Sequence, residues 1–205
     1  MKNKFIIAAL ASLVSILPAS AQQPGKVDPA LVTKVVADIF KGAPPEWQAR
    51  IVQDETQQVC SQYRNDPPKD LLEKLIAREK AAVVYPADGK FLGDWKNGEK
   101  LAQRGTGGQF SDNAQTAKGG NCYACHQMEL KELSYGTLGP SLLEYGKIRK
   151  FSSEDAKAAY AKIYNAQSVQ PCSNMPRFGH NKFLTETEMK DLTAYLFDPE
   201  SPVNK

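Results

Sequence analysis

The stretch Cys122-Tyr123-Ala124-Cys125-His126 has the pattern C-x-x-C-H, the attachment signature of c-type haem. In such a motif the two thiols form thioethers with the haem, and the histidine ligates the iron. A zinc site would need a full set of ligands, and no second C-x-x-C or H-x-x-x-H supplies them. A redox dithiol would belong to a βαβ unit, which is not visible in the sequence. We therefore expect one covalent haem c, held by Cys122 and Cys125, with His126 as proximal iron ligand.

The first 21 residues have the features of a secretory signal peptide. Lys2 and Lys4 precede an uncharged apolar run over residues 5–17, and Ala19-Ser20-Ala21 is an A-x-A cleavage site. The run is shorter than the roughly 18 residues that indicate a spanning helix, although an uncleaved membrane anchor is the alternative. We expect cleavage after Ala21 and a periplasmic mature protein, with no membrane partner after cleavage.

The charge balance says little about partners. The chain of 205 residues carries 26 Lys and Arg against 23 Asp and Glu, a net charge of +3, and two of the lysines lie in the predicted signal peptide. No basic stripe is visible, so we expect no nucleic-acid partner.

Residues 22–90 are predicted to form an N-terminal helical extension. Asp28 and Pro29 have the positions of a helix cap and first residue, Gly42 ends this first pattern, and Asp66-Pro67-Pro68 separates the second pattern from the third. The three patterns carry apolar residues at Leu31, Val32, Val35, Val36, Ile39 and Phe40, at Trp47, Ile51 and Val52, and at Leu71, Leu72, Leu75 and Ile76.

Residues 91–205 are predicted to form the haem domain. The sequence indicates a helix over 97–104, a loop over 105–120, a turn at 136–140, a helix from Ser153 and a last helix opened by the capping box of Thr185 and Glu188. This order resembles the class I cytochrome c fold, and Gly98 and Tyr195 resemble the family's contact between first and last helices. The fold class is therefore expected to be all-α, a class I cytochrome c domain with the extension before it.

The sixth iron ligand has to come from elsewhere in the chain. Met128 is too close to His126, and Met189 lies on the apolar face of the last helix. Met175 precedes a proline in a segment that resembles the Met-Pro distal loop of class I cytochromes, and we expect it to be the ligand. His180 is the alternative, since both ligand types occur in cytochromes.

A more specific resemblance is to the SoxX family, the monohaem cytochrome subunits of the thiosulfate-oxidising SoxAX complex. It is carried by residues 119–126, 136–142, 145–149 and 172–179, which read GGNCYACH, GTLGPSL, YGKIR and CSNMPRFG. The resemblance implies an electron-transfer subunit of an L-cysteine S-thiosulfotransferase whose catalytic haem lies on SoxA. This chain would then have no catalytic residue of its own. The implied partners are SoxA in a heterodimer, the carrier SoxYZ transiently, and a small cytochrome c as electron acceptor.

Two other functions stay open. One is a free-standing class I electron carrier with a helical extension, and the other is a haem-based sensor whose ligand displaces Met175. For the SoxA-like partner, Lys147, Arg149 and Arg177 are candidates for contact with the partner or with haem propionates.

Cys60 and Cys172 are the two cysteines that the haem does not use. In an oxidising compartment we expect a disulfide between them, which would tie the extension to the loop of Met175. Two buried free thiols, or a reactive surface Cys172, are the alternatives.

Overall fold

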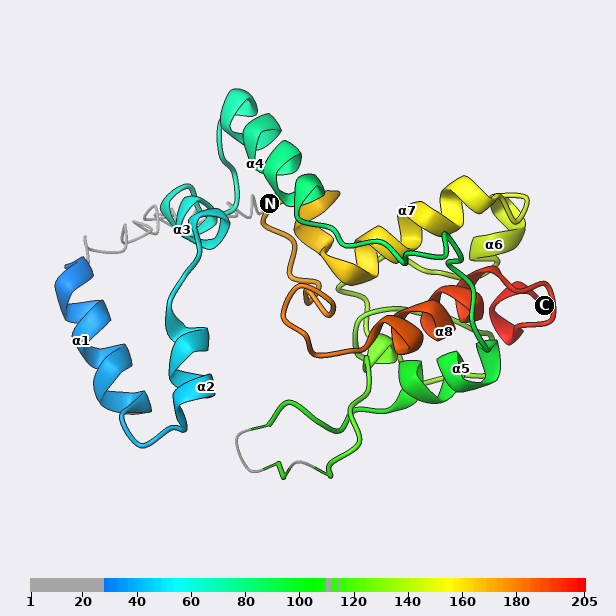
Figure 1. Cartoon of the computed structure of the whole chain (residues 1–205), viewed down its shortest axis with the longest axis horizontal. Coiled ribbons are helices and arrows are strands. Elements are labelled where there is room, and N and C mark those ends of the chain that lie inside the picture. Colours follow the sequence, from blue (N-terminus) through cyan, green and yellow to red (C-terminus); the bar gives the residue numbers. More distant parts are fainter. Residues whose placement is uncertain (1–27, 110–111, 114) are drawn as a thin grey trace, which may run out of the picture. The chain divides into compact units, whose positions relative to one another are not determined.

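A computed structural model of the chain describes residues 28–109, 112–113 and 115–205 (Figure 1). The predicted signal peptide, residues 1–21, lies outside the described residues. The chain divides into two compact units, residues 1–42 and 43–205. The predicted domain boundary near residue 90 stays a prediction, and residues 43–90 share the second unit with the residues that follow them.

The described part of the first unit is helix α1, Pro29–Phe40, which the sequence predicted. The Asp28 carboxylate accepts a hydrogen bond from the Ala30 amide at 2.9 Å, and Pro29 occupies the first helical position, where its missing N–H costs nothing. Leu31, Val35 and Ile39 are exposed along one side of this helix.

The second unit begins with α2 (Pro45–Gln48), the 3-10 turn η1 (Ala49–Ile51), α3 (Glu55–Gln62) and α4 (Lys69–Ala81). The prediction of one helical pattern between Pro45 and Asp66 was wrong, because this segment forms two helices, α2 and α3, with η1 between them. Asp54 starts α3 with a capping box, in which its carboxylate accepts from the Gln57 amide and its own amide donates to the Gln57 side chain.

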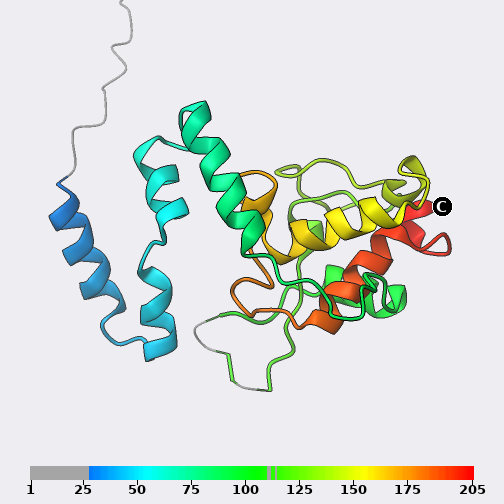
Figure 2. The same ribbon diagram turned by 45° about the horizontal axis from the view of Figure 1, so that its top comes forward.

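Helices α5 (Trp95–Gln103) and α8 (Glu186–Phe197) form a packed helix crossing in the second unit, and both views draw them side by side (Figures 1 and 2). The crossing depends on Gly98, since a Cβ built there would lie 2.1 Å from the Asp191 carbonyl oxygen and 2.8 Å from the Tyr195 Cβ. The predicted contact of Gly98 with Tyr195 is therefore confirmed. The capping box at Thr185 and Glu188 is confirmed as well.

Helix α7 (Ser153–Tyr164) packs on α8 and completes the core, in which Tyr160, Tyr195 and Phe197 are fully buried. Shorter elements connect the helices: η2 (Cys122–Ala124), α6 (Tyr145–Ile148), η3 (Ala166–Ser168) and η4 (Pro202–Asn204). The described residues contain no β-strand, so the all-α prediction is confirmed. Among the same residues, no helix has both the length and the apolar character needed to span a bilayer.

Candidate haem site

The C-x-x-C-H motif forms a tight turn that brings its two thiols and its imidazole together. Asn121 enters the turn in the left-handed conformation, with φ 46°, and η2 follows. The amides of Cys125 and His126 both donate to the Cys122 carbonyl, at 3.1 and 2.8 Å. Cys122 and Cys125 are free thiols, as haem attachment requires. Burial, together with the neighbouring Cys125, raises the pKa of the Cys122 thiol to about 12, so this group is protonated at neutral pH.

His126 is held by the turn that follows the motif. Its Nδ1 lies 2.7 Å from the carbonyl oxygen of Pro140. A carbonyl can only accept, so Nδ1 carries the proton and the lone pair is on Nε2, which is the atom that a metal binds. Gly139 lies against the ring, because a Cβ there would be 2.2 Å from the His126 Cε1. The predicted turn at 136–140 thus sets both the tautomer and the orientation of the imidazole.

Tyr123, inside the motif, anchors the turn to the helix crossing. Its hydroxyl lies 2.7 Å from the Tyr195 hydroxyl and 3.2 Å from the buried Glu129 carboxylate. Since the carboxylate can only accept, the proton of Tyr123 points to Glu129 and Tyr195 donates to Tyr123. Burial raises the pKa of Tyr123 to about 12, and both tyrosines are neutral at physiological pH. Sequence patterns missed this triad, although Tyr195 stood out through its contact with Gly98.

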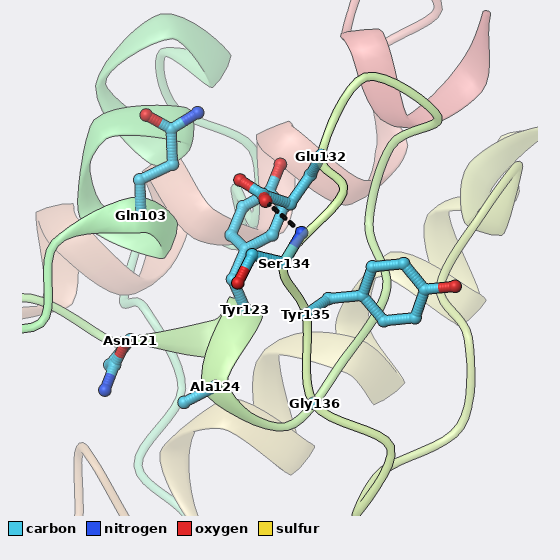
Figure 3. Close-up of a pocket in the computed structure, with 8 residues that line it drawn as sticks. All are labelled: Gln103, Asn121, Tyr123, Ala124, Glu132, Ser134, Tyr135 and Gly136. Atoms are coloured by element: carbon cyan, nitrogen blue, oxygen red, sulfur yellow. Dashed lines mark hydrogen bonds between the residues drawn. The ribbon is translucent and has the colours of Figure 1, made fainter.

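A polar cavity of about 470 Å³ lies beside the motif (Figure 3). It is lined by Gln103, Asn121, Tyr123, Ala124, Glu132, Ser134, Tyr135 and Gly136. The Glu132 carboxylate accepts from the Ser134 amide at 2.6 Å, and the Tyr135 hydroxyl points away from the other lining side chains. Neither His126 nor Met175 lines this cavity, so we do not assign it to the iron.

The candidates for the sixth ligand lie in different surroundings. Met128 and Met189 are core residues, exposed by 2% and 3%. His180 is an exposed residue whose amide donates to the Tyr164 carbonyl. Met175 is only partly buried and packs against the edge of the core from a loop without helical structure. Of the three candidate methionines, Met175 is the one whose side chain the core does not enclose.

The loop that carries Met175 is attached to α3. Cys60 of α3 and Cys172 form a disulfide with their Cα atoms 5.3 Å apart, which confirms the predicted pairing. Arg177 is a second attachment. The sequence suggested it for partner contact, but it is only 7% exposed and its guanidinium pairs with Asp54 at 2.5 Å.

The two other cations proposed for partner contact make local interactions. Lys147 pairs with Glu144 at 2.5 Å, and the Arg149 guanidinium lies 3.6 Å from the centroid of the Tyr145 ring. Lys147 is exposed, whereas Arg149 is partly buried by this stacking.

The residues present fit a covalently attached haem. Two free thiols stand on one turn, followed by a histidine whose tautomer leaves Nε2 available. Across the described residues, no group of three or more His, Cys, Asp or Glu side chains could hold a metal ion by itself. The donor set of this turn consists of two thiols and one imidazole. It is the set that a haem with an axial histidine needs.

An all-α domain with this motif, this histidine tautomer and a methionine loop defines a c-type cytochrome. The Cytochrome c family model matches residues 93–198, and the chain belongs to this family. It therefore binds haem c covalently and serves haem-based electron transfer. The chain is also 36% identical, over 211 residues, to an uncharacterized lipoprotein of Aquifex aeolicus (strain VF5), with all of both chains covered.

Proposed function

We propose that His126 and Met175 are the axial ligands of the haem iron and that the protein is an electron-transfer cytochrome of high potential. The observation that carries this is the hydrogen bond of His126 Nδ1 to Pro140, which fixes the ligand nitrogen. When bound, the haem supplies the one-electron chemistry, and a thioether ligand raises its potential. Met175 supports the proposal because its side chain is partly exposed on a loop fixed at Cys172 and Arg177.

The ligand assignment is tested by the ferric absorption spectrum. His–Met ligation gives a weak sulfur-to-iron band near the red edge of the visible range, and Met175→Ala should abolish this band and lower the potential. Met128→Leu is the matched control, since it removes a thioether from the core while keeping most of the side-chain volume. Persistence of the band in Met175→Ala would contradict the assignment.

We further propose that the protein is the SoxX-type subunit of a SoxAX complex. In this proposal it accepts the electrons released when thiosulfate is joined oxidatively to a cysteine of the SoxYZ carrier, and it passes them to a small cytochrome c. The catalytic haem of this L-cysteine S-thiosulfotransferase would lie on SoxA. The combination of GTLGPSL at 136–142 with CSNMPRFG at 172–179 supports it. The first of these segments holds His126 and the second carries Met175, the two residues proposed as axial ligands.

The SoxAX proposal is tested by affinity purification of the tagged protein from cells grown on thiosulfate, with haem staining of the bands that co-purify. A second haem protein at equal stoichiometry is the expected result. A monomer that many donors reduce would instead indicate a free-standing electron carrier. Binding of carbon monoxide by the ferrous form at neutral pH would indicate a sensor.

We also propose a periplasmic location. The A-x-A site at 19–21 and the disulfide both support export, because disulfides persist in oxidising compartments. The Aquifex relative is named a lipoprotein, which agrees with export. Cell fractionation with N-terminal sequencing tests the proposal, and a mature protein that begins at Gln22 is expected.

A further inference from the structure

The distal loop, residues 172–179, is held at both ends by helices that lie outside the residues of the cytochrome c match. At its start, Cys172 is bonded to Cys60 in the last turn of α3. Near its end, Arg177 pairs with Asp54, the N-cap of α3, at 2.5 Å, and lies 3.7 Å from Glu79 of α4. Met175 lies between these two attachment points.

The first attachment point keeps the backbone in an unfavourable conformation. Cys172 has φ 63°, in the left-handed region that side chains with a Cβ seldom adopt. Its amide donates to the Gln167 side chain at 2.5 Å, and Gln167 in turn donates to the Ser173 carbonyl at 3.1 Å. A loop without these attachments would disfavour the left-handed backbone at Cys172. The disulfide and the hydrogen bond to Gln167 therefore maintain this conformation.

The second attachment point is a charge network in which Arg177 and Glu79 are buried and Asp54 is partly exposed. Glu79 is only 4% exposed, and it accepts hydrogen bonds from Thr56 and, at 2.7 Å, from Asn165. Burial opposes its ionisation, but these hydrogen bonds and Arg78 outweigh the effect and lower the pKa of Glu79. Arg177 therefore faces an ionised partner. Removing one member of a buried pair is costly, because it leaves the other charge without compensation.

The free segment between the two attachment points is short. Gln167 also fixes the Ser173 carbonyl, and beyond Arg177 the amides of Gly179 and His180 both donate to the Tyr164 carbonyl at 3.0 Å. Both ribbon views show the end of α4 beside the segment around residues 165–180 (Figures 1 and 2). The segment that carries Met175 is thus attached to α3 and α4 as well as to Gln167 and Tyr164.

We propose that Asp54, Cys60 and Glu79 are positioning residues for Met175, and that α3 and α4 act as a clamp that keeps the thioether in place as the sixth ligand. The inference rests on the proposed ligation by Met175. A loop released at either end gains conformations in which the sulfur has left the iron. Exogenous imidazole binds only to those conformations, so its apparent affinity reports the fraction of protein in them.

Asp54→Asn is the most selective variant. Asparagine caps a helix about as well as aspartate, so α3 keeps its N-cap. Arg177 then loses the charge of Asp54, while that of Glu79 remains 3.7 Å away. Asp88→Asn is the matched control, because the Asp88 ion pair with Lys190, at 3.0 Å, also joins distant parts of the unit and does not involve the distal loop. The double variant Cys60→Ser/Cys172→Ser releases the other attachment point.

The experiment is a titration of each ferric holoprotein with imidazole, followed through the sulfur-to-iron band, with circular dichroism to verify folding. We expect imidazole to bind at least tenfold more tightly to Asp54→Asn and to the double serine variant than to wild type. Binding to Asp88→Asn should be unchanged. Wild-type affinity in Asp54→Asn would overturn the clamp, and this variant decides the matter alone if the serine variant does not fold.

Met175→Ala separates the two proposals. If this variant keeps the sulfur-to-iron band, the ligand assignment fails and the clamp fails with it. If it loses the band while Asp54→Asn and the serine variant bind imidazole as wild type does, the ligand assignment stands and the clamp alone is refuted.

Discussion

Replacement of Gly98 by alanine should destabilise the protein through the crossing of α5 and α8. The new Cβ would lie 2.1 Å from the Asp191 carbonyl oxygen, which belongs to the backbone of α8 and cannot rotate away. An ordinary contact at this point needs roughly 3.4 Å or more, so the two helices have to separate by about an ångström. Overpacking of this kind costs about 1–3 kcal/mol, occasionally more.

Alanine also has an opposing, favourable effect. Gly98 lies in the interior of α5, where alanine is better than glycine by roughly 0.8–1 kcal/mol. We expect the steric cost to exceed this gain, because the contact is with backbone, and to leave a net loss of about 1 kcal/mol. For a unit of this size the loss corresponds to a fall in Tm of about 2–4 °C.

Differential scanning calorimetry of the holoprotein measures the effect, and Gly98→Val should be more severe than Gly98→Ala. Gly42→Ala is the matched control, since a Cβ there meets no atom within 4 Å. A Gly98→Ala protein with the wild-type Tm, or a higher one, would refute the reasoning. It would show that α5 and α8 can move apart without loss of packing.

Three further results are expected. Cys122→Ala with Cys125→Ala should give apoprotein, while wild-type haem should survive acid–acetone extraction; extractable haem in wild type would disprove the thioethers. The stability advantage of wild type over Glu79→Gln should be full above about pH 4.5 and should shrink as the pH falls further, because the pKa of Glu79 is lowered in the folded state. Urea unfolding between pH 7 and 3 measures this difference, and a constant difference would contradict it. Tyr195→Phe should lower the free energy of unfolding by about 0.5–1.5 kcal/mol, since Tyr123 loses its donor; an unchanged value in chemical denaturation would show that Tyr123 is not held by this bond.

Local signals were sufficient to predict much of the fold. The cap at Asp28, the capping box at Thr185 and the small residue at Gly98 each act over a few residues or at one contact, and the structure has all three. The capping box at Asp54 is equally local, but the apolar residues before it masked the break, and two helices were read as one.

The charge network was not predictable in the same way. Arg177 was a candidate for contact with a partner or a haem propionate, and its two partners in the structure, Asp54 and Glu79, are distant in sequence. Glu79 did give a signal. It follows Leu72 and Leu75 at helical spacing on α4, so it continues the buried face of that helix as a charged residue. A buried carboxylate of this kind requires a partner, although the spacing does not say which one.

The disulfide has a consequence for biogenesis. The motif cysteines, Cys122 and Cys125, lie inside the 112-residue separation of Cys60 and Cys172. If the chain is exported from its N-terminus, as proposed, Cys60 crosses the membrane first, the two haem-binding thiols follow, and Cys172 crosses last. Four free thiols allow three sets of pairings, and attachment of haem to two of them leaves one. Haem attachment before disulfide formation would therefore leave only the Cys60–Cys172 pairing, the one that fixes the Met175 loop to α3.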